Sequence, residues 1–466
     1  MQFHPMISAA ARWGDLVAPR YAAATATLCL GIALFAFNGF LVATCLPTAV
    51  EELGGAALIS WSLTLYLAFA IVGGTGAAYA KQRLGGRASL IGAALLVLAG
   101  SLVAGLAPDM PTVLVGRVLQ GLGEGLVSAL CYALIPELFP AALVPKVFGA
   151  ESLVWAIAAF GGPLLAGVLT QFVSWRAAFL VNVPLAVLFI ALASALVPAG
   201  KAHAATARVP GLRLGAVGGA VLLLCWAGIA RGLLVLALMF AAAGLLIALA
   251  LRLDGRAREP LLPSAAFSPR GTIGAGLWIV LMMPMAEAAA AVFLAFALQR
   301  LWGYNATQAG AANALMAMFW SLTALGVANV ASQRRRQSLI GLGPVLLVAG
   351  LLGLLFALRH EATALLFFGQ ALLGMAFGVT WGPLSQALME TAPPAERDRT
   401  SALLPTLQSA GYAIGAALHG FAANTAGLAS GSDAGLAKAM TVVLGLGVAM
   451  AQAAVAAGMA FRRSVA

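Results

Sequence analysis

Charged residues are scarce in this 466-residue chain: only 9% of the residues are Asp, Glu, Lys or Arg, whereas 62% are apolar. Soluble domains contain about 25% charged and about 45–50% apolar residues. So few charges cannot cover the surface of a soluble fold of this length, and the same hydrophobicity excludes a disordered chain. The composition therefore predicts a protein that crosses a lipid bilayer several times.

The residues of metal and nucleotide chemistry are also few. The chain has four Cys and four His, and none has the spacing of a disulfide or zinc framework. It has no G-x-x-x-x-G-K-[ST] motif. No loop between apolar segments exceeds about 20 residues, which is too short for a soluble catalytic domain. We therefore expect no metal, no cofactor and no enzyme activity.

Long apolar segments dominate the sequence instead. A helix needs about 20 largely apolar residues to cross a bilayer, because only internal hydrogen bonds satisfy its backbone there. The sequence leaves open whether the two segments within 213–251 both cross. It predicts an all-α membrane protein with 14 spans, near 22–46, 57–79, 88–107, 111–136, 147–171, 178–198, 213–230, 232–251, 272–299, 306–331, 338–358, 362–389, 401–424 and 437–461.

The basic residues indicate an orientation. Of the 26 Lys and Arg, twenty lie in the termini and in alternate loops, and Arg117 lies inside a span. Basic residues collect on the cytoplasmic side, so we expect both termini in the cytoplasm and the protein in the inner (plasma) membrane. The charges form no basic stripe, which argues against nucleic-acid binding. The remaining five are in the predicted outer loops: Arg176, Arg231, Arg300, Arg359 and Lys438.

The chain also repeats itself. A shift of 253 residues places one set of glycines and acidic residues on another, and it relates predicted spans of the first half to those of the second. Transporters built from such parallel repeats bind substrate between their halves. We expect a six-span bundle at 1–200, a hairpin with linkers at 201–271 and a second six-span bundle at 272–466. The matched pairs include Gly121 with Gly374, Gly125 with Gly378, Glu137 with Glu390 and Gly162 with Gly415.

Several motifs resemble those of the major facilitator superfamily. An R-x-x-Q-G-x-G motif starts at Arg117, a G-P-x-x-x-G stretch starts at Gly162, and a W-R-x-x-F-x-x-N-x-P block runs over 175–184. Together they are similar to the 14-span drug:proton antiporter branch. Asn38 and Gln82 stand where that branch has acidic residues. The resemblance implies alternating access between two bundles, with gating or motif roles for Arg83, Gly85, Arg87, Gly162, Pro163 and Gly167.

Ionisable residues at bilayer depth are candidates for proton coupling, because each costs at least ~2.5–3.5 kcal/mol to insert. Arg117, Gln120 and Glu124 share one helix face, and we expect Gln120 or water to bridge Arg117 and Glu124. Glu287 lies near the middle of another span, and Glu151 lies near a cytoplasmic span end. Arg117 is the fourth candidate. A purely structural role is the alternative for each carboxylate.

Other polar and aromatic residues are candidates for contact with substrate or for gating, although each can equally pack helices together. Glu137 and Glu390 lie at cytoplasmic span ends, and we expect them to pair with the Arg-bearing loops as latches. The substrate-cavity candidates are Asn38, Gln120, Tyr132, Trp155, Met283, Trp320, Gln370, Trp381 and Gln408.

The sequence thus predicts a transporter, which we expect to be monomeric, with a small organic molecule and protons as its ligands. The first hypothesis is proton-coupled efflux of a small organic molecule or drug. An uptake symporter or facilitator for one metabolite is the alternative. A membrane sensor or assembly partner that transports nothing is the second alternative.

Overall fold

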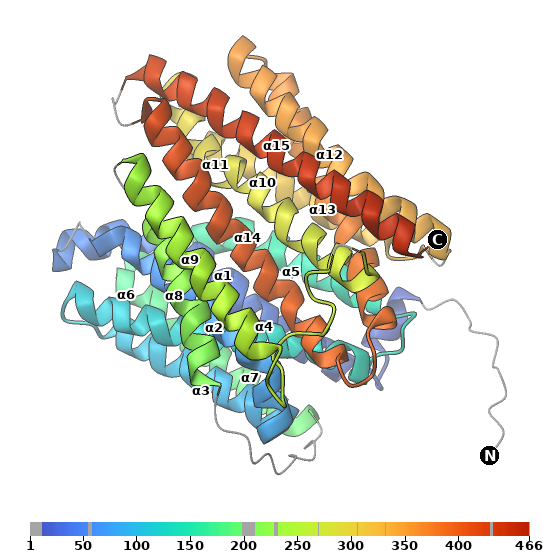
Figure 1. The fold of residues 1–466 in the computed structure, drawn as a ribbon. Coiled ribbons are helices and arrows are strands. Elements are labelled where there is room, and N and C mark those ends of the chain that lie inside the picture. The colour runs from blue at the N-terminus through green and yellow to red at the C-terminus, as the bar shows by residue number, and fades with distance from the viewer. Residues whose placement is uncertain are drawn as a thin grey trace, which may run out of the picture.

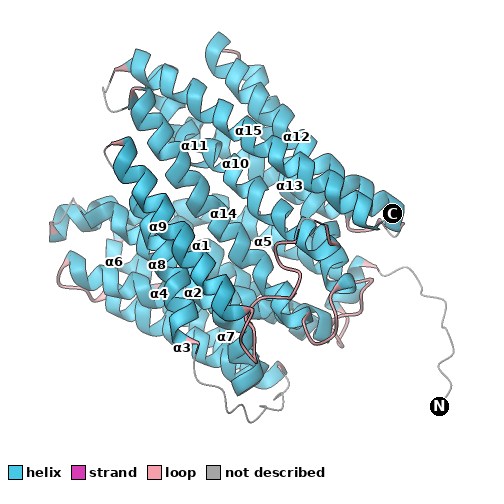
Figure 2. Cartoon of the chain, in the orientation of Figure 1, coloured by secondary structure: helices cyan, strands magenta, loops and turns pink. Residues whose placement is uncertain are grey.

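In the computed structural model, the described residues are 12–54, 58–197, 210–227, 232–268, 270–304, 306–330, 332–428 and 432–465. Within these ranges all regular structure is helical (Figure 2). Inside a bilayer no water is present to satisfy a backbone amide or carbonyl, so long apolar segments form helices. The polar helix ends are capped locally: the Asp109 side chain accepts a hydrogen bond from the amide of Thr112 at 2.8 Å.

The helices fall into two groups joined by a hairpin. A short 3-10 helix, η1 (Trp13–Val17), precedes the first group. The first group contains α1 (Ala22–Leu53), α2 (Ile59–Leu84), α3 (Gly86–Gly105), α4 (Met110–Leu138), α5 (Val144–Phe172), α6 (Trp175–Leu180) and α7 (Asn182–Leu196). The hairpin consists of α8 (Gly211–Ala227) and α9 (Leu233–Asp254). The second group contains α10 (Thr272–Leu301), α11 (Ala306–Val327), α12 (Gln333–His360), α13 (Thr363–Thr391), α14 (Arg397–Ala426) and α15 (Asp433–Val465).

Each of the fourteen predicted segments falls on a helix, and the sixth is divided between α6 and α7. Among the described residues, twelve helices are long and apolar enough to cross a membrane. The remaining two are α8, which is shorter, and α14, which begins with the charged run 397–399 and is more polar. The all-helical membrane fold is therefore confirmed, whereas the count of fourteen spans stays a prediction.

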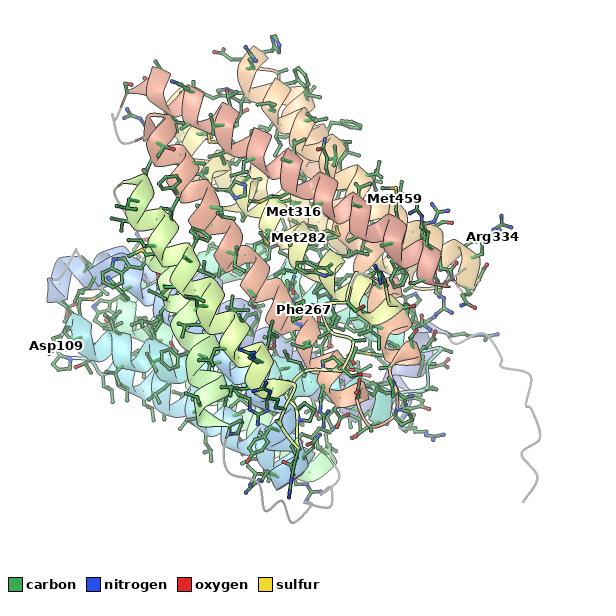
Figure 3. All side chains as sticks on the ribbon, viewed as in Figure 1. Asp109, Phe267, Met282, Met316, Arg334 and Met459 are labelled. Carbon is green, nitrogen blue, oxygen red and sulfur yellow. The ribbon has the colours of Figure 1, made fainter. Side chains whose placement is uncertain are left out.

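The two groups lie side by side, with the hairpin across their junction (Figure 1). Helix α8 contacts α2 of the first group and α14 of the second. Asp109 and Arg334 mark opposite ends of the molecule (Figure 3), which we call the Asp109 end and the Arg334 end. Helix α4 starts at the first end and α12 starts at the second. In the predicted orientation the Arg334 end is cytoplasmic.

The repeated glycines occupy equivalent packing positions in the two groups. A methyl group at Gly121 or Gly125 of α4 would collide with the backbone of α2, and one at Gly374 or Gly378 of α13 would collide with the backbone of α11. The pair Gly162 and Gly415 behaves similarly, because the first packs on α1 and the second on α10. Small residues allow close helix contact in a membrane. The repeated glycines in the sequence therefore correspond to the same helix packing in both groups.

We expect Gly121→Ala to destabilise the protein by about 1–3 kcal/mol, because the added methyl group meets the backbone of Tyr66. Gly167→Ala is the matched control: no heavy atom lies within 4 Å of the position of its methyl group, and alanine favours a helix over glycine. Thermal unfolding of the purified variants in detergent measures the difference. Equal melting temperatures for the two variants would contradict the packing role of Gly121.

A polar clamp at the Asp109 end joins α1 to α6. The indole nitrogen of Trp175 donates a hydrogen bond to Glu52 at 2.8 Å, and the Arg176 guanidinium donates another at 2.6 Å. The hydrogen bond from Arg176, and after it the bond from Trp175, holds the pKa of the Glu52 carboxyl below its usual range. The Trp and Arg that begin the W-R-x-x-F-x-x-N-x-P block therefore hold α6 against the end of α1.

The clamp predicts a pH-dependent contribution to stability. Because the pKa of Glu52 is lowered in the folded state, its contribution is present above the ordinary value for glutamate, about 4.3, and is lost as the pH falls through the folded value. Glu52→Gln should therefore lower the melting temperature at neutral pH, and the gap to the wild type should shrink in acid. A gap that stays constant down to acid pH would contradict the clamp.

Candidate functional site

Glu124 lies in the interior of the first group, with a side chain that is 0% exposed. The hydroxyl of Tyr66, on α2, donates a hydrogen bond to its Oε2 at 2.5 Å. Its other oxygen, Oε1, has no hydrogen-bond partner among the described residues. Tyr66 is thus the one donor with good hydrogen-bond geometry to this carboxyl group among the described residues, and the Asn38 side chain also lies within range of it. An ionised carboxylate accepts several hydrogen bonds.

Arg117 lies close to this pair but does not bond to Glu124. Its guanidinium carbon stands 4.0 Å from the centre of the Tyr66 ring, which is a cation–π contact. It donates to Gln120 Oε1 at 2.8 Å and to the carbonyl of Ser62 at 3.4 Å. Gln120 does not bond to Glu124 in the described structure, so the expected bridge through Gln120 is wrong, whereas a bridge through water stays a prediction. Tyr66 instead contacts both Arg117 and Glu124. Sequence spacing along α4 did not reveal Tyr66, since that residue comes from α2.

Gln120 instead belongs to a network of neutral side chains. Its Nε2 donates to Ser101 Oγ at 3.0 Å and to Asn38 Oδ1 at 3.4 Å. Asn182 on α7 donates to the same Asn38 oxygen at 3.2 Å. Asn38 and Gln120 are both fully buried, so these two substrate-cavity candidates lie in a network that joins α1, α3, α4 and α7. Nothing in the sequence pointed to Ser101 or Asn182 as their partners.

Two further buried carboxylates each lie beside a tyrosine. The hydroxyl of Tyr412, on α14, is within hydrogen-bonding range of Glu287 on α10. Glu287 is 4% exposed and the neighbouring Met283 is 2% exposed. Glu151 on α5 lies near Tyr132 of α4, but neither of its oxygens meets hydrogen-bond geometry with the described residues. All three predicted carboxylates are therefore buried inside the helix bundle rather than turned toward lipid.

Tyr132 also links the two groups of helices. The indole nitrogen of Trp381, on α13, donates a hydrogen bond to the Tyr132 hydroxyl at 3.1 Å. A second hydrogen bond joins the groups nearby: the Ser321 hydroxyl of α11 donates to the backbone carbonyl of Ser152 on α5 at 2.6 Å. Both contacts lie toward the Arg334 end, where α4 and α13 finish and α5 begins. They place Tyr132, Trp381 and Glu151 at the junction between the groups.

An ion-pair cluster closes the junction at the Arg334 end. Lys81 contacts Glu137 at 2.7 Å within the first group and Asp398 at 2.9 Å in the second. Its side chain is only 7% exposed. Glu390 contacts Arg336 at 3.4 Å within the second group. Glu137 thus pairs with a lysine rather than an arginine. Among the described ion pairs, only that of Lys81 with Asp398 joins the two groups.

The loop that carries Arg83, Gly85 and Arg87 lies next to this cluster. Gly85 has a φ of +81°, a left-handed conformation that favours glycine, and it separates α2 from α3. The Arg83 guanidinium stacks on the Tyr79 ring at 5.4 Å. Arg87 donates to the carbonyl of Val197 at 2.5 Å, which ties the loop to the end of α7. These contacts fix the loop within the first group.

The remaining substrate candidates pack against other side chains. The Trp155 ring meets the Phe35 ring edge-on at 5.8 Å, and the Trp320 ring stacks on Phe377 at 4.7 Å. Gln370 donates to Asn313 at 3.1 Å, and Gln408 is half-buried on α14. The motif residue Pro163 lies in the interior of α5.

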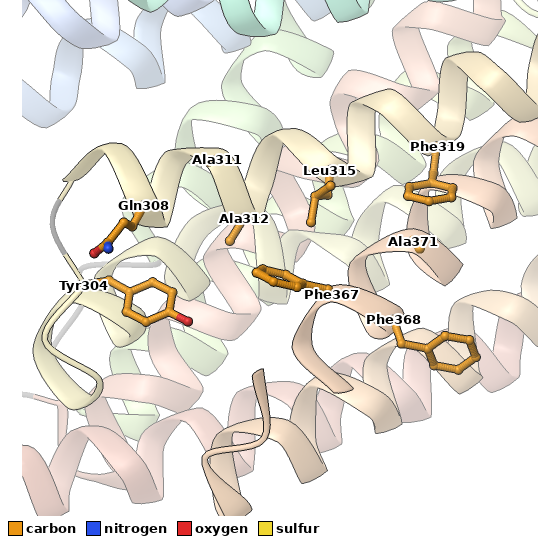
Figure 4. Close-up of a pocket in the computed structure, with 9 residues that line it drawn as sticks. All are labelled: Tyr304, Gln308, Ala311, Ala312, Leu315, Phe319, Phe367, Phe368 and Ala371. Carbon is orange, nitrogen blue, oxygen red and sulfur yellow. The ribbon is translucent and has the colours of Figure 1, made fainter. Parts of the chain in front are cut away.

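A cavity of about 750 Å³ lies elsewhere, between α11 and α13 toward the Asp109 end. Figure 4 shows its aromatic lining, which includes Phe319, Phe367 and Phe368. Tyr304 and Gln308 are at one end of it. None of the predicted substrate-cavity residues lines this cavity, so their role in substrate binding stays a prediction.

Comparison with known proteins agrees with this architecture. The sequence pattern of the Major Facilitator Superfamily matches residues 28–416. A probable multidrug-efflux transporter of Mycobacterium tuberculosis is 32% identical over 452 residues, which cover 94% of this chain and 95% of that protein. An uncharacterized transporter of Escherichia coli is 24% identical over 86% of this chain and 88% of its own length.

Solved structures show the same fold at low sequence identity. The human organic anion transporter MFSD10 superposes with a TM-score of 0.69 at 15% identity, covering 94% of this chain and 99% of that one. The proton:xylose symporter XylE gives a TM-score of 0.65 at 17% identity, covering 92% and 94%. On the family match and the full-length relative, the chain belongs to the Major Facilitator Superfamily and is a membrane transporter.

Proposed function

We propose that this transporter exports small organic molecules across the plasma membrane in exchange for protons, with Glu124 as the residue that carries the proton. The main support is the environment of Glu124: a fully buried carboxyl group with one well-formed hydrogen bond, from Tyr66, one oxygen without such a bond, and no ion pair among the described residues. An unpaired carboxylate is expensive in the membrane interior. Gain and loss of a proton therefore change how well this group fits its site.

Tyr66 and Arg117 give Glu124 two states that differ in their contacts. As an anion, the carboxylate accepts the short bond from Tyr66 and is attracted by the guanidinium that lies over the face of that ring. As a neutral acid it needs neither contact, and its own proton becomes a donor. Glu287 beside Tyr412 has a related environment in the second group and is the second candidate for the same role.

Alternating access requires that the contacts between the two groups form and break. The contacts of Lys81 with Asp398 and of Trp381 with Tyr132 hold the groups together at the Arg334 end. In the proposed orientation, with both termini in the cytoplasm, the structure is thus a state closed toward the cytoplasm. From this state Glu124 loads a proton from outside, the groups rock, and the proton leaves on the cytoplasmic side where substrate then binds.

Glu151 lies close enough to Tyr132 to take part in this gate. When Glu151 is ionised it can accept a hydrogen bond from the nearby Tyr132 hydroxyl, whose oxygen at the same time accepts the bond from Trp381. We assign Glu151 to gate control rather than to proton transport across the membrane. The full-length similarity to a probable multidrug-efflux transporter supports the outward direction.

Glu124→Gln is the direct test of the proposal. The variant should fold but lose transport driven by a pH gradient in proteoliposomes, because glutamine has no titratable proton. In the wild type, a pH dye inside the vesicles should report protons moving opposite to the substrate. Proton movement in the same direction as the substrate would contradict export by exchange, and no solute movement by the reconstituted protein would contradict transport itself.

Two further variants make the result specific. Glu287→Gln tests the second candidate, and we expect it to retain part of the gradient-driven transport that Glu124→Gln loses. Glu259→Gln, which changes a carboxylate in the linker before α10, is the matched control and should behave as the wild type. Undiminished dependence on the gradient in Glu124→Gln would exclude Glu124 as the proton carrier.

Lys81→Gln tests the closed end. The substitution removes the ion pair with Asp398, and a partly exposed pair contributes of order 1 kcal/mol. We expect a several-fold shift toward the state open at the Arg334 end, measured as a longer distance between spin labels at Ala142 and Arg335. Arg334→Gln removes a charge at the same end without an ion pair in the described structure and is the control. Identical distance distributions in the two variants would contradict the latch.

A further inference from the structure

We propose that a second pocket, at the Asp109 end of the second group, binds the anionic headgroup of a membrane phospholipid. This pocket of about 420 Å³ lies where α10 and α12 end and α15 begins. Its lining combines basic side chains with apolar ones such as Leu355 and Leu444. The proposal depends on the orientation given above, in which this end meets the outer leaflet, but not on proton coupling.

The charges at this end are the first argument. Among the basic residues of the predicted outer loops, Arg176 pairs with Glu52 and Arg300 pairs with Asp433. Arg231 lies outside the described residues. Arg359 and Lys438 make no ion pair with the described residues, and both line this pocket. Basic residues are disfavoured in outer loops, so two that converge on one cavity without forming an ion pair with a described residue indicate an external anion.

One carboxylate is also present. Glu361 lines the pocket next to Arg359 in the sequence, at a left-handed position with φ 51° that ends α12. It is exposed, and it offsets only one of the two positive charges. The pocket therefore keeps a net positive charge for a ligand with a single negative charge, such as a phosphodiester.

Trp302 supplies the second argument. Its indole Nε1 is buried without a hydrogen-bond partner among the described residues, and the residue lines the same pocket. A buried donor that is left unpaired costs free energy. An anionic oxygen that enters beside Arg359 and Lys438 provides the acceptor that this N–H lacks. Charge-assisted hydrogen bonds of this kind are about twice as strong as neutral ones.

The neighbouring groove favours a lipid over a free phosphate ion. The Trp302 ring meets the Tyr304 ring edge-on at 5.6 Å, and Tyr304 lines the apolar cavity of Figure 4 with Phe367 and Phe368. Those two phenylalanines are 43% and 59% exposed. Tryptophan and tyrosine concentrate where a membrane meets water. A headgroup in the charged pocket thus has an apolar groove beside it that can receive an acyl chain.

The test uses native mass spectrometry of the purified full-length protein, titrated with phosphatidylglycerol, which is anionic, or with phosphatidylcholine, which is zwitterionic. We expect tighter binding of phosphatidylglycerol, and about a tenfold rise in its Kd in Arg359→Gln and in Lys438→Gln. Trp302→Phe, which removes the donor but keeps an aromatic ring, should raise this Kd several-fold. Arg334→Gln, which removes a charge at the opposite end of the same helix, should leave it unchanged.

Inorganic phosphate serves as the competitor. It should fail to displace phosphatidylglycerol at concentrations far above that of the lipid, because it lacks an acyl chain. Displacement by phosphate would overturn the lipid assignment in favour of a free anion. Equal binding of the two lipids, or an unchanged Kd in both Arg359→Gln and Lys438→Gln, would overturn the site. Lys438 is the sixth residue of α15 and is exposed. The Lys438→Gln variant should therefore fold, so that an altered Kd reports on lipid binding and not on misfolding.

Discussion

The hydrogen bond between Tyr66 and Glu124 holds an ionisable carboxyl group in the protein interior, where it is 0% exposed and forms no ion pair with the described residues. The other parts of the proposed mechanism depend on this arrangement. Helix α2 can supply Tyr66 only because the glycines of α4 let the two backbones approach. Arg117 lies over the face of the Tyr66 ring and forms no ion pair with Glu124, so in the proposed mechanism it favours the anion without fixing it. A direct ion pair would instead hold Glu124 ionised and prevent proton turnover.

The same close packing is repeated in both groups, and in the proposed mechanism each group moves as a unit against the other. The polar contacts between the groups include an ion pair at Lys81, an indole-to-hydroxyl bond at Trp381 and a serine bond at Ser321. Each is individually weak enough to break during a transport cycle. The hairpin of α8 and α9 adds a different constraint, because α8 contacts α2 of the first group and α14 of the second at once.

Hydropathy was sufficient to locate the long helices, since the need for about 20 apolar residues is a local property of the sequence. It did not indicate the short helix η1 or the break between α6 and α7. Glu124, Glu287 and Glu151 were found for a similar reason, because a charge in an apolar segment is conspicuous by itself. Their partners were not, since Tyr66 reaches Glu124 from another helix and Asp398 reaches Lys81 from more than 300 residues away. Such pairs depend on how helices rotate and pack. The fourteen-span count remains a prediction because α14 is too polar for a judgement from composition, although it packs against α10 and α2.

The central claim is that Glu124 releases its proton when substrate binds, and infrared difference spectroscopy of the reconstituted protein tests it most directly. Addition of a transported substrate should remove the carbonyl-stretch absorption of a protonated carboxylic acid and produce that of a carboxylate. The change should be absent when position 124 is glutamine. A difference spectrum that shows no carboxyl signal, or the same signal with and without Glu124, would contradict the account.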